Sequence, residues 1–196
     1  MCKEFRALGH EAYSADILPC SGGHPEWHIQ GDVTKILNDG WDLMIAHPPC
    51  TYLAVSGNRW LYNKDGSKNE ERWEKRSEAL DFVRTLLEAP IERIALENPV
   101  SVISSQIRKP EQIIQPYMFG DEATKTTCLW LKNLPLLYPT DLVGKGERVV
   151  FKSGKSHPKW YAEALAKSKT PEERRTLRSK TVVGIAKAMA DQWGNI

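Results

Sequence analysis

Short apolar runs recur along the chain between turn residues, and their length predicts β-strands. Residues 41–46 are apolar almost without interruption and end at Pro48–Pro49, a pattern typical of a parallel strand covered on both faces. The other runs are also closed by glycine, proline or polar residues. The predicted strands cover residues 12–18, 41–46, 91–96 and 126–131.

Segments with helical spacing separate these strands. In the longest predicted helix, residues 69–88, apolar side chains fall on one stripe and charged side chains fill the opposite face. Thr170–Glu173 has the pattern of a helix start, with a capping box and proline at the first helical position. The stripe consists of Trp73, Leu80, Val83 and Leu87, and shorter helices are predicted over 1–8, 33–38 and from about Thr181 to Trp193.

The alternation of strands and helices predicts an α/β fold with a mostly parallel sheet. Ligands of such sheets bind at the carboxyl ends of the strands. Polar signals follow three predicted strands, namely Asp16, the segment His47–Cys50 and the pair Glu97–Asn98. We therefore expect these residues to meet at one crevice.

Composition places the chain among globular proteins. It has 196 residues, of which 41% are hydrophobic and 27% charged, which predicts a single domain over residues 1–196. No apolar run approaches the roughly 20 residues of a membrane span, so no membrane association is expected. The charged N-terminus lacks the apolar core of a signal peptide, which favours a cytoplasmic protein, and four scattered cysteines do not form a disulfide framework.

The net charge of +2 is unevenly distributed. Residues 143–180 contain eleven Lys and Arg against four Asp and Glu. Such a segment is typical of a polyanion-binding surface, and equally of a solvated surface with basic side chains. We interpret it as a basic insert within the domain.

Cys50 is the strongest candidate for chemistry. The two prolines before it fix φ and remove two backbone donors, so the turn at the strand end is stiff. A thiolate held there is a strong nucleophile. The alternative is a small buried cysteine that only packs.

Carboxylates follow the other predicted strands. Glu97 can hold or transfer a proton in the same crevice, or it can cap a helix that starts at Asn98–Pro99. Asp16 and Asp32 are candidates for ribose hydroxyls, or for helix caps. The spacing of Cys20, His24 and His28 also permits a zinc site, although only three ligands lie close in sequence.

These residues together resemble a known family. The ordered set AYSADI, GDV, PPCTYLAVSG and ALENP is similar to the motifs of DNA cytosine-5 methyltransferases, and most similar to the small, stand-alone, phage-type members. The resemblance covers most of the chain, including the closing TVVGIAKAMADQWG, although Pro99 stands where the larger enzymes usually have valine. It implies a Rossmann-like class I methyltransferase fold, a phage-encoded protein of a bacterial cell, S-adenosyl-L-methionine as cofactor and DNA as partner.

The resemblance also implies roles for individual residues. Cys50 would attack C6 of a cytosine, and Glu97, with Asn98 beside it, would form a hydrogen bond at N3. Asp16 would lie at the cofactor ribose and Asp32 near its adenine, within a cofactor set of Asp16, Ile17, Asp32, Val33 and Pro48. The nucleic-acid set comprises Ser56, Gly57, Arg59 and Trp60, in a loop over an extruded nucleotide, together with Lys152, Lys155 and Lys159.

Two departures from the family change these expectations. The chain opens at the helix that normally follows the first strand and the first cofactor motif. An N-terminally shortened sheet with weak cofactor binding is therefore expected. Such a sheet has a gap or unpaired edges, which pairing in a homodimer would cover. The basic insert at 143–180 stands in place of a target-recognition domain, which predicts short or loose sequence specificity. The alternative functions are a catalytically disabled member that binds nucleic acid or a partner protein and, third, a zinc-supported structural module.

Overall fold

A computed structural model of the chain describes residues 1–179 and 182–196, which form two compact units. The sheet unit comprises Tyr13–Ile114 and Thr126–Leu136, and the helical unit comprises Met1–Ala12, Gln115–Lys125 and Leu137–Ile196. The chain passes between the units more than once, so neither is a continuous stretch of sequence. The expectation of a single domain over residues 1–196 stays a prediction.

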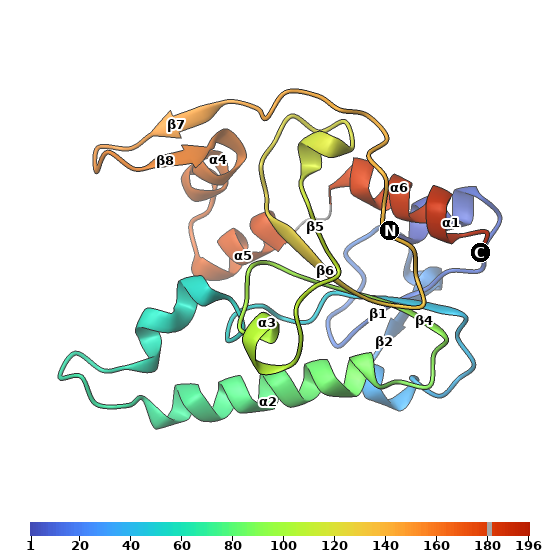
Figure 1. The fold of residues 1–196 in the computed structure, drawn as a ribbon, viewed down its shortest axis with the longest axis horizontal. Coiled ribbons are helices and arrows are strands. Elements are labelled where there is room, and N and C mark those ends of the chain that lie inside the picture. Colours follow the sequence, from blue (N-terminus) through green and yellow to red (C-terminus); the bar gives the residue numbers. More distant parts are fainter. Residues whose placement is uncertain (180–181) are drawn as a thin grey trace. The chain divides into compact units, whose positions relative to one another are not determined.

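The sheet unit is built on four strands in the order β3-β4-β6-β5 (Figure 1). Strand β3 runs parallel to β4, whereas β6 is antiparallel to both β4 and β5. The α/β architecture is therefore confirmed, and its sheet is mixed. The strands are β3 (Leu43–Ala46), β4 (Arg93–Asn98), β5 (Gln112–Ile114) and β6 (Thr127–Lys132).

Two further strands, β1 (Ser14–Asp16) and β2 (His28–Gln30), form a separate parallel sheet in the same unit. Within the described residues, β1 pairs only with β2 and β3 only with β4. The parallel strands are thus divided between two sheets. The homodimer that would cover such edges remains a prediction.

The long helix α2 (Glu70–Leu87) confirms the predicted helix over 69–88. The side chain of Asn69 caps it by accepting the backbone N–H of Arg72 at 3.1 Å, and two glutamates occupy the first turn. It ends before Pro90, which cannot continue a helix. Leu80, Val83 and Leu86 are its buried apolar residues. The predicted stripe is thus confirmed at Leu80 and Val83, whereas Trp73 and Leu87 are only partly buried.

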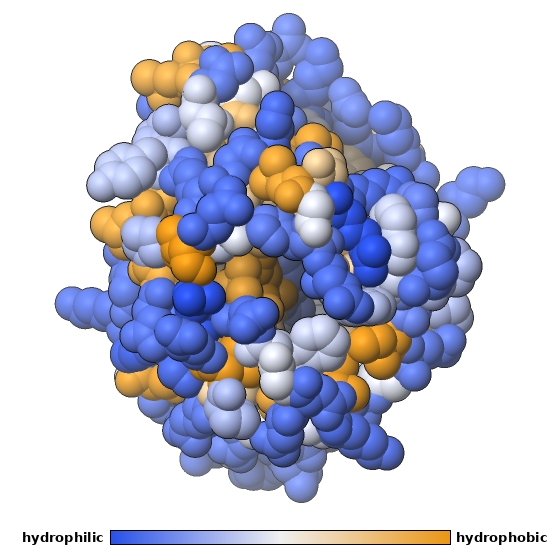
Figure 2. All heavy atoms as spheres, turned by 90° about the vertical axis from the view of Figure 1, so that its right-hand side faces the viewer, coloured by the Kyte–Doolittle hydropathy of each residue, from blue (hydrophilic) through white to orange (hydrophobic). Residues whose placement is uncertain are grey.

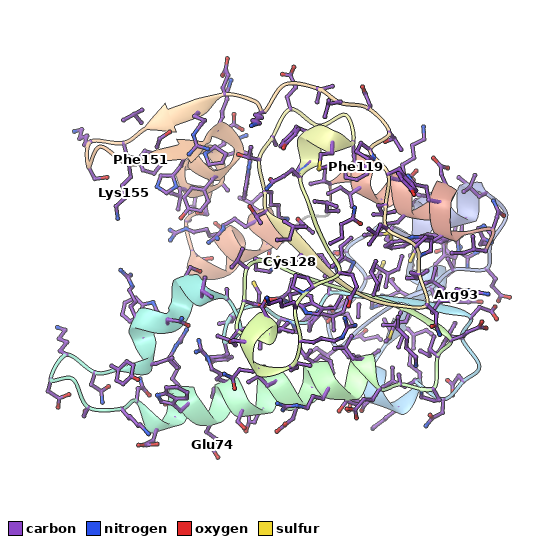
Figure 3. The ribbon with its side chains drawn as sticks, in the orientation of Figure 1. Glu74, Arg93, Phe119, Cys128, Phe151 and Lys155 are labelled. Carbon is purple, nitrogen blue, oxygen red and sulfur yellow. The ribbon has the colours of Figure 1, made fainter. Side chains whose placement is uncertain are left out.

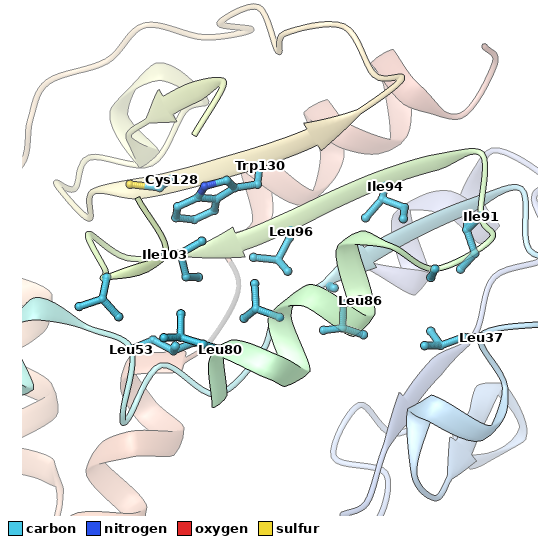
Figure 4. Close-up of a cluster of buried hydrophobic side chains, with 14 residues drawn as sticks. Leu37, Leu53, Leu80, Leu86, Ile91, Ile94, Leu96, Ile103, Cys128 and Trp130 are labelled. Carbon is cyan, nitrogen blue, oxygen red and sulfur yellow. The ribbon is translucent and has the colours of Figure 1, made fainter. Parts of the chain in front are cut away.

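The core of the sheet unit lies between α2 and the four-stranded sheet (Figure 4). Trp130 of β6 is fully buried in it, and its indole N–H donates to the carbonyl oxygen of Arg108 at 2.7 Å. Shorter elements connect the strands: η1 (Pro25–Trp27), η2 (Val33–Lys35), η3 (Val55–Leu61) and α3 (Ile103–Gln106). The helix predicted over 33–38 is only the short 3₁₀ turn η2.

In the helical unit, α1 (Cys2–Ala7) contacts α6 (Val183–Trp193). At the start of α6, a Cβ on Gly184 would fall 1.7 Å from the carbonyl oxygen of Phe119, so only glycine fits there. The predicted end of the last helix at Trp193 is confirmed, while its predicted start, Thr181, lies outside the described residues. The other elements are η4 (Pro116–Met118), β7 (Arg148–Val150), β8 (Ser156–Pro158), α4 (Lys159–Lys167) and α5 (Pro171–Ser179).

The predicted capping box begins α5. The backbone N–H of Glu173 donates to Thr170 Oγ1 at 3.1 Å, and Glu173 Oε2 accepts the backbone N–H of Thr170 at 3.3 Å. Each residue thus satisfies a backbone donor of the other, as this motif requires. The sequence pattern therefore fixes the start of this helix within the basic insert.

Hydrophilic side chains dominate the face of the molecule in Figure 2, and hydrophobic ones form small separate groups on it. Scattered exposed apolar side chains of this kind are normal for a folded chain. Within residues 1–179 and 182–196, no helix combines the length and the apolar character that crossing a membrane requires.

Candidate active site

The turn that carries Cys50 follows β3 directly, and it is held on both sides. Before the cysteine, the carbonyl oxygen of Pro48 accepts a hydrogen bond from Asn98 Nδ2 at 3.0 Å. After it, the carbonyl oxygen of Cys50 accepts the backbone N–H groups of Leu53 and Ala54 at 3.1 and 2.9 Å. Cys50 itself is exposed, so the alternative of a buried cysteine that only packs is wrong.

Glu97 stands beside this turn on the neighbouring strand. The parallel register pairs Ala46 with Leu96, which brings the next residues, His47 and Glu97, opposite each other. His47 Nδ1 lies 3.2 Å from Glu97 Oε2. Glu97 belongs to β4 and the next helix begins at Ile103, so the alternative in which Glu97 caps a helix starting at Asn98–Pro99 is wrong.

His47 was not among the predicted site residues. A histidine before two prolines carries no strong signal by itself. Its partner follows only from the register of β3 on β4, which pairs residues 50 positions apart. The hydrogen bond fixes the orientation of the Glu97 carboxyl group at the carboxyl end of the sheet.

Asn98 is a structural partner of the turn rather than an exposed group. It is only 1% exposed, and its amide nitrogen holds the Pro48 carbonyl. Its Oδ1 is buried without a hydrogen-bond partner among the described residues. The predicted catalytic residues therefore separate into an exposed thiol, a half-buried carboxyl group and a buried amide that ties the two strand ends together.

The second cysteine near this end of the sheet is inert by comparison. Cys128 pairs with Asn98 in the antiparallel register of β4 and β6 and is 2% exposed. Burial raises the pKa of the Cys128 thiol, and the negative charge of Glu97 raises it further. Because a protonated, buried thiol is a poor nucleophile, Cys50 is the sulfur of this pair that can react.

Two arginines of α2 clamp the segment that follows Cys50. Arg72 Nη2 donates to the carbonyl oxygen of Thr51 at 3.3 Å, and Arg76 Nε donates to that of Tyr52 at 2.9 Å. Arg76 also donates to Asn58 Oδ1 at 2.7 Å, and it is buried. Removal from water lowers the pKa of Arg76, and the positive charge of Arg72 lowers it further.

These arginines were missed because the stripe of α2 was defined by its apolar residues alone, although Arg76 stands three residues after Trp73 and four before Leu80, on the same side of the helix. The predicted loop residues Ser56, Gly57, Arg59 and Trp60 all belong to η3. A Cβ on Gly57 would lie 3.1 Å from Arg72 Nη2, so the glycine allows the guanidinium group to approach. Of the other three, Arg59 and Trp60 are exposed and lie together, with the guanidinium carbon 4.3 Å from the centre of the indole ring.

Replacing Arg76 by alanine is expected to destabilise the chain by about 2–4 kcal/mol, because it leaves the Tyr52 carbonyl and the Asn58 side chain without their donor. Urea denaturation followed by circular dichroism measures the change. Arg84→Ala is the matched control on the same helix, since the side chain of Arg84 is 42% exposed and forms a surface ion pair with Asp81, and it is expected to shift stability by less than about 0.5 kcal/mol. Equal effects of the two substitutions would show that the clamp contributes nothing.

The predicted cofactor residues lie on both sheets. Asp16 is the last residue of β1 and Ile17 follows it; both are exposed, and Asp16 Oδ1 accepts the backbone N–H of Leu18 at 2.9 Å. Asp32 is exposed as well, but its side chain caps η2 by accepting the backbone N–H of Thr34. This hydrogen bond and, second to it, the one from the Thr34 hydroxyl group lower the pKa of Asp32. This agrees with the helix-cap alternative for Asp32. Val33 is partly buried in η2, and Pro48 is buried in the cysteine turn.

Exposed carboxylates suit the ribose hydroxyls of S-adenosylmethionine, and the 71% exposed side chain of Ile17 suits its adenine. The described residues therefore fit the nucleoside half of this cofactor in chemical character. Among the described residues, the predicted cofactor residues line neither the pocket of about 340 Å³ nor the pocket of about 530 Å³.

The zinc alternative finds no support. His24 stacks on Trp27 with ring centres 3.8 Å apart, and His28 is hydrogen-bonded to Ser14 and Leu18. Among the residues that the structure describes, no three or more His, Cys, Asp and Glu side chains are grouped to hold a metal ion. Cys20 is a free thiol.

The basic insert lies in the helical unit, where β7 and β8 form a hairpin followed by α4 and α5. Lys152 and Lys155 are exposed in the hairpin turn, and Figure 3 shows Lys155 and Phe151 there. Lys159 differs, because its Nζ donates to Glu147 Oε2 at 2.6 Å beside a pocket of about 340 Å³ that Glu122 and Glu163 also line. The hydrogen bond from Lys159, and then its charge, lower the pKa of Glu147.

If the insert contacts DNA phosphates, Lys155→Gln is expected to weaken DNA binding and to reduce the slope of log Kd against log salt by about 1. Lys159→Gln is expected to change the slope less, because Glu147 already neutralises that charge. Fluorescence anisotropy with a labelled oligonucleotide at several salt concentrations measures both. An unchanged slope for Lys155→Gln would indicate a solvated surface.

Compared with known proteins, the sequence matches no protein-family model, and no curated protein matches it at a significant level. The candidate function therefore depends on the site itself. That site is an exposed cysteine on a pinned turn, at the shared carboxyl end of two parallel strands, next to a glutamate oriented by a histidine.

Proposed function

We propose that the chain is a DNA cytosine-5 methyltransferase-like enzyme of Rossmann-like class I type, in which Cys50 is the nucleophile. The observation that carries the proposal is that the turn bearing Cys50 and the residue Glu97 stand at the ends of two adjacent parallel strands. Two hydrogen bonds join these ends, one between His47 and Glu97 and one from Asn98 to Pro48. Thiol and carboxyl groups are the two that addition to a pyrimidine ring requires.

The chemistry follows from the poor nucleophilicity of cytosine C5. Addition of the Cys50 thiolate to C6 pushes electron density toward C5, which then behaves as an enamine carbon. A hydrogen bond from Glu97 at N3 stabilises the negative charge that develops on the ring. His47 is a positioning residue in this scheme, because it holds the carboxyl group through Oε2.

When bound, S-adenosylmethionine supplies a methyl cation equivalent to C5. Asp16 and Ile17 are the exposed residues that would hold its nucleoside half. Loss of the C5 proton and departure of the Cys50 sulfur then restore the aromatic ring. The target cytosine must leave the base stack or be unpaired, because C6 is inaccessible inside a duplex.

The proposal is tested by incubating the chain with DNA and S-adenosylmethionine that carries a deuterated methyl group. Nucleosides from the digested DNA are then separated by liquid chromatography and identified by mass spectrometry. We expect deuterated 5-methylcytosine that depends on Glu97 and Cys50. Methyl groups on an exocyclic nitrogen, or none on any base, would overturn the proposal.

A catalytically disabled DNA-binding protein with the same fold is the second candidate. It is favoured by the separation of the predicted cofactor residues, since Asp16 ends β1 in one sheet and Pro48 follows β3 in the other. Such a protein binds DNA without forming 5-methylcytosine. The digestion experiment, combined with a binding measurement on the same DNA, distinguishes the two candidates.

A further inference from the structure

A pocket of about 530 Å³ lies in the sheet unit, on the segment between η3 and the start of α2. This volume is within the range of sites that hold small molecules, roughly 300–1,000 Å³. Two aromatic side chains in its wall, Trp60 and Tyr62, are 54% and 50% exposed. The lining residues are Trp60, Tyr62, Asn63, Lys64, Asn69 and Arg72, so the charged side chains among them are both basic.

The backbone of this segment is fixed. Tyr62 forms an antiparallel bridge with Lys68, and the backbone N–H of Asn69 donates to the Leu61 carbonyl at 2.9 Å. The tip is closed by Asp65, which accepts both the backbone N–H and the hydroxyl of Ser67 at 2.9 and 2.6 Å. Large aromatic side chains on a fixed backbone lose little conformational entropy when a ligand covers them.

Rings and cations alternate along the segment. The guanidinium group of Arg59 lies over Trp60, as described above, and Tyr62 meets Trp73 edge-on with ring centres 6.3 Å apart. Trp73 in turn has the ammonium group of Lys68 at 5.9 Å from its ring centre. Flat rings beside cations are the arrangement that binds single-stranded nucleic acid, because bases stack on the rings while phosphates meet the cations.

The pocket is joined to the active-site turn by Arg72. This side chain lines the pocket, lies over the ring of Tyr52 at 5.1 Å, and donates to the carbonyl oxygen of Thr51, the residue after Cys50. Arg72 thus contacts both the pocket and the segment that directly follows Cys50.

We propose that this pocket holds an unpaired base of single-stranded DNA next to the target cytosine. The base stacks on Trp60 and Tyr62, and the phosphate beside it contacts Arg59 or Lys64. The occupant is single-stranded, because the faces of a paired base are covered by its neighbours in the duplex and cannot stack on protein rings. The position next to the target rests on the proposed function, whereas binding in the pocket does not require catalysis.

Binding is measured by fluorescence anisotropy with a labelled 12-nucleotide thymidine strand containing one central cytosine. The double variant Trp60→Ala/Tyr62→Ala is expected to bind it about 5- to 150-fold more weakly, the effect of losing base stacking. Trp60→Phe keeps a flat ring and is expected to retain most of the affinity. Tyr138→Ala, which removes a 74% exposed tyrosine of the helical unit, is the matched control and is expected to bind like the wild type.

A second strand, with abasic sites on both sides of the cytosine, separates stacking from charge. The wild type is expected to bind this strand about as weakly as the double variant binds the intact one. Equal affinity of the wild type and the correctly folded double variant for the intact strand would overturn the proposal, and so would equal affinity of the wild type for both strands. These binding results do not depend on 5-methylcytosine formation. The binding experiment can therefore contradict the pocket proposal while the methyltransferase proposal stands, and the digestion experiment can contradict the methyltransferase proposal while the pocket proposal stands.

Discussion

Replacing Cys50 by alanine is expected to abolish methyl transfer to cytosine, with a loss of at least about a thousandfold, while DNA binding changes little. Without the sulfur no covalent bond to C6 can form, and C5 stays a poor nucleophile. DNA binding is retained because Cys50 contributes one exposed side chain to the surface. The rate is measured as deuterated 5-methylcytosine formed per unit time, and binding as anisotropy on the same DNA.

The matched control for this loss is Cys20→Ala, which removes another free thiol of the same unit, in the segment between β1 and η1. It is expected to keep the rate of the wild type. If Cys50→Ala retained more than about a tenth of the activity, the thiol could not be the nucleophile. If both substitutions abolished activity equally, the loss would reflect a general effect of removing a cysteine.

Replacing Trp130 by alanine is expected to produce the largest loss of stability, about 3–5 kcal/mol. The indole ring is fully buried between α2 and the sheet, next to Leu96 in the β4–β6 register. Its removal leaves a large cavity and also frees the Arg108 carbonyl that its N–H satisfies at 2.7 Å. Urea denaturation followed by far-ultraviolet circular dichroism measures the change without depending on tryptophan fluorescence.

Trp60→Ala is the matched control, because it makes the same chemical change at a ring that is half exposed in the same unit. We expect it to cost less than about 1 kcal/mol. A Trp130→Ala protein as stable as the Trp60→Ala protein would contradict the packing of β6 on α2.

The sequence predicts well those elements whose pattern is local. The helix α2 follows from its stripe and from the Asn69 cap, and α5 from the Thr170–Glu173 capping box. Strand β3 is found because an apolar run ends at two prolines, which cannot continue a central strand. The exposed position of Cys50 follows from the same turn.

The features that were missed depend on contacts between distant residues. His47 meets Glu97 because of the register of β3 on β4. Arg76 is buried where it donates to the carbonyl oxygen of Tyr52, a residue 24 positions earlier in the chain. The first of these contacts leaves no periodic trace in the sequence, whereas Arg76 does stand at a position of the stripe of α2, where its charge hid its burial. The antiparallel direction of β6 and the division into two units are likewise set by long connections, which hydrophobic patterns do not describe.

Formation of a covalent bond between Cys50 and a cytosine ring is the central claim, and DNA containing 5-fluorocytosine tests it most directly. Fluorine at C5 cannot leave as a proton does, so the ring stays attached to the sulfur after methyl transfer. In the presence of S-adenosylmethionine we expect a DNA adduct that survives denaturation, with its mass assigned to the peptide of Cys50 and absent in Cys50→Ser. No stable adduct, or one that persists in Cys50→Ser, would contradict the account.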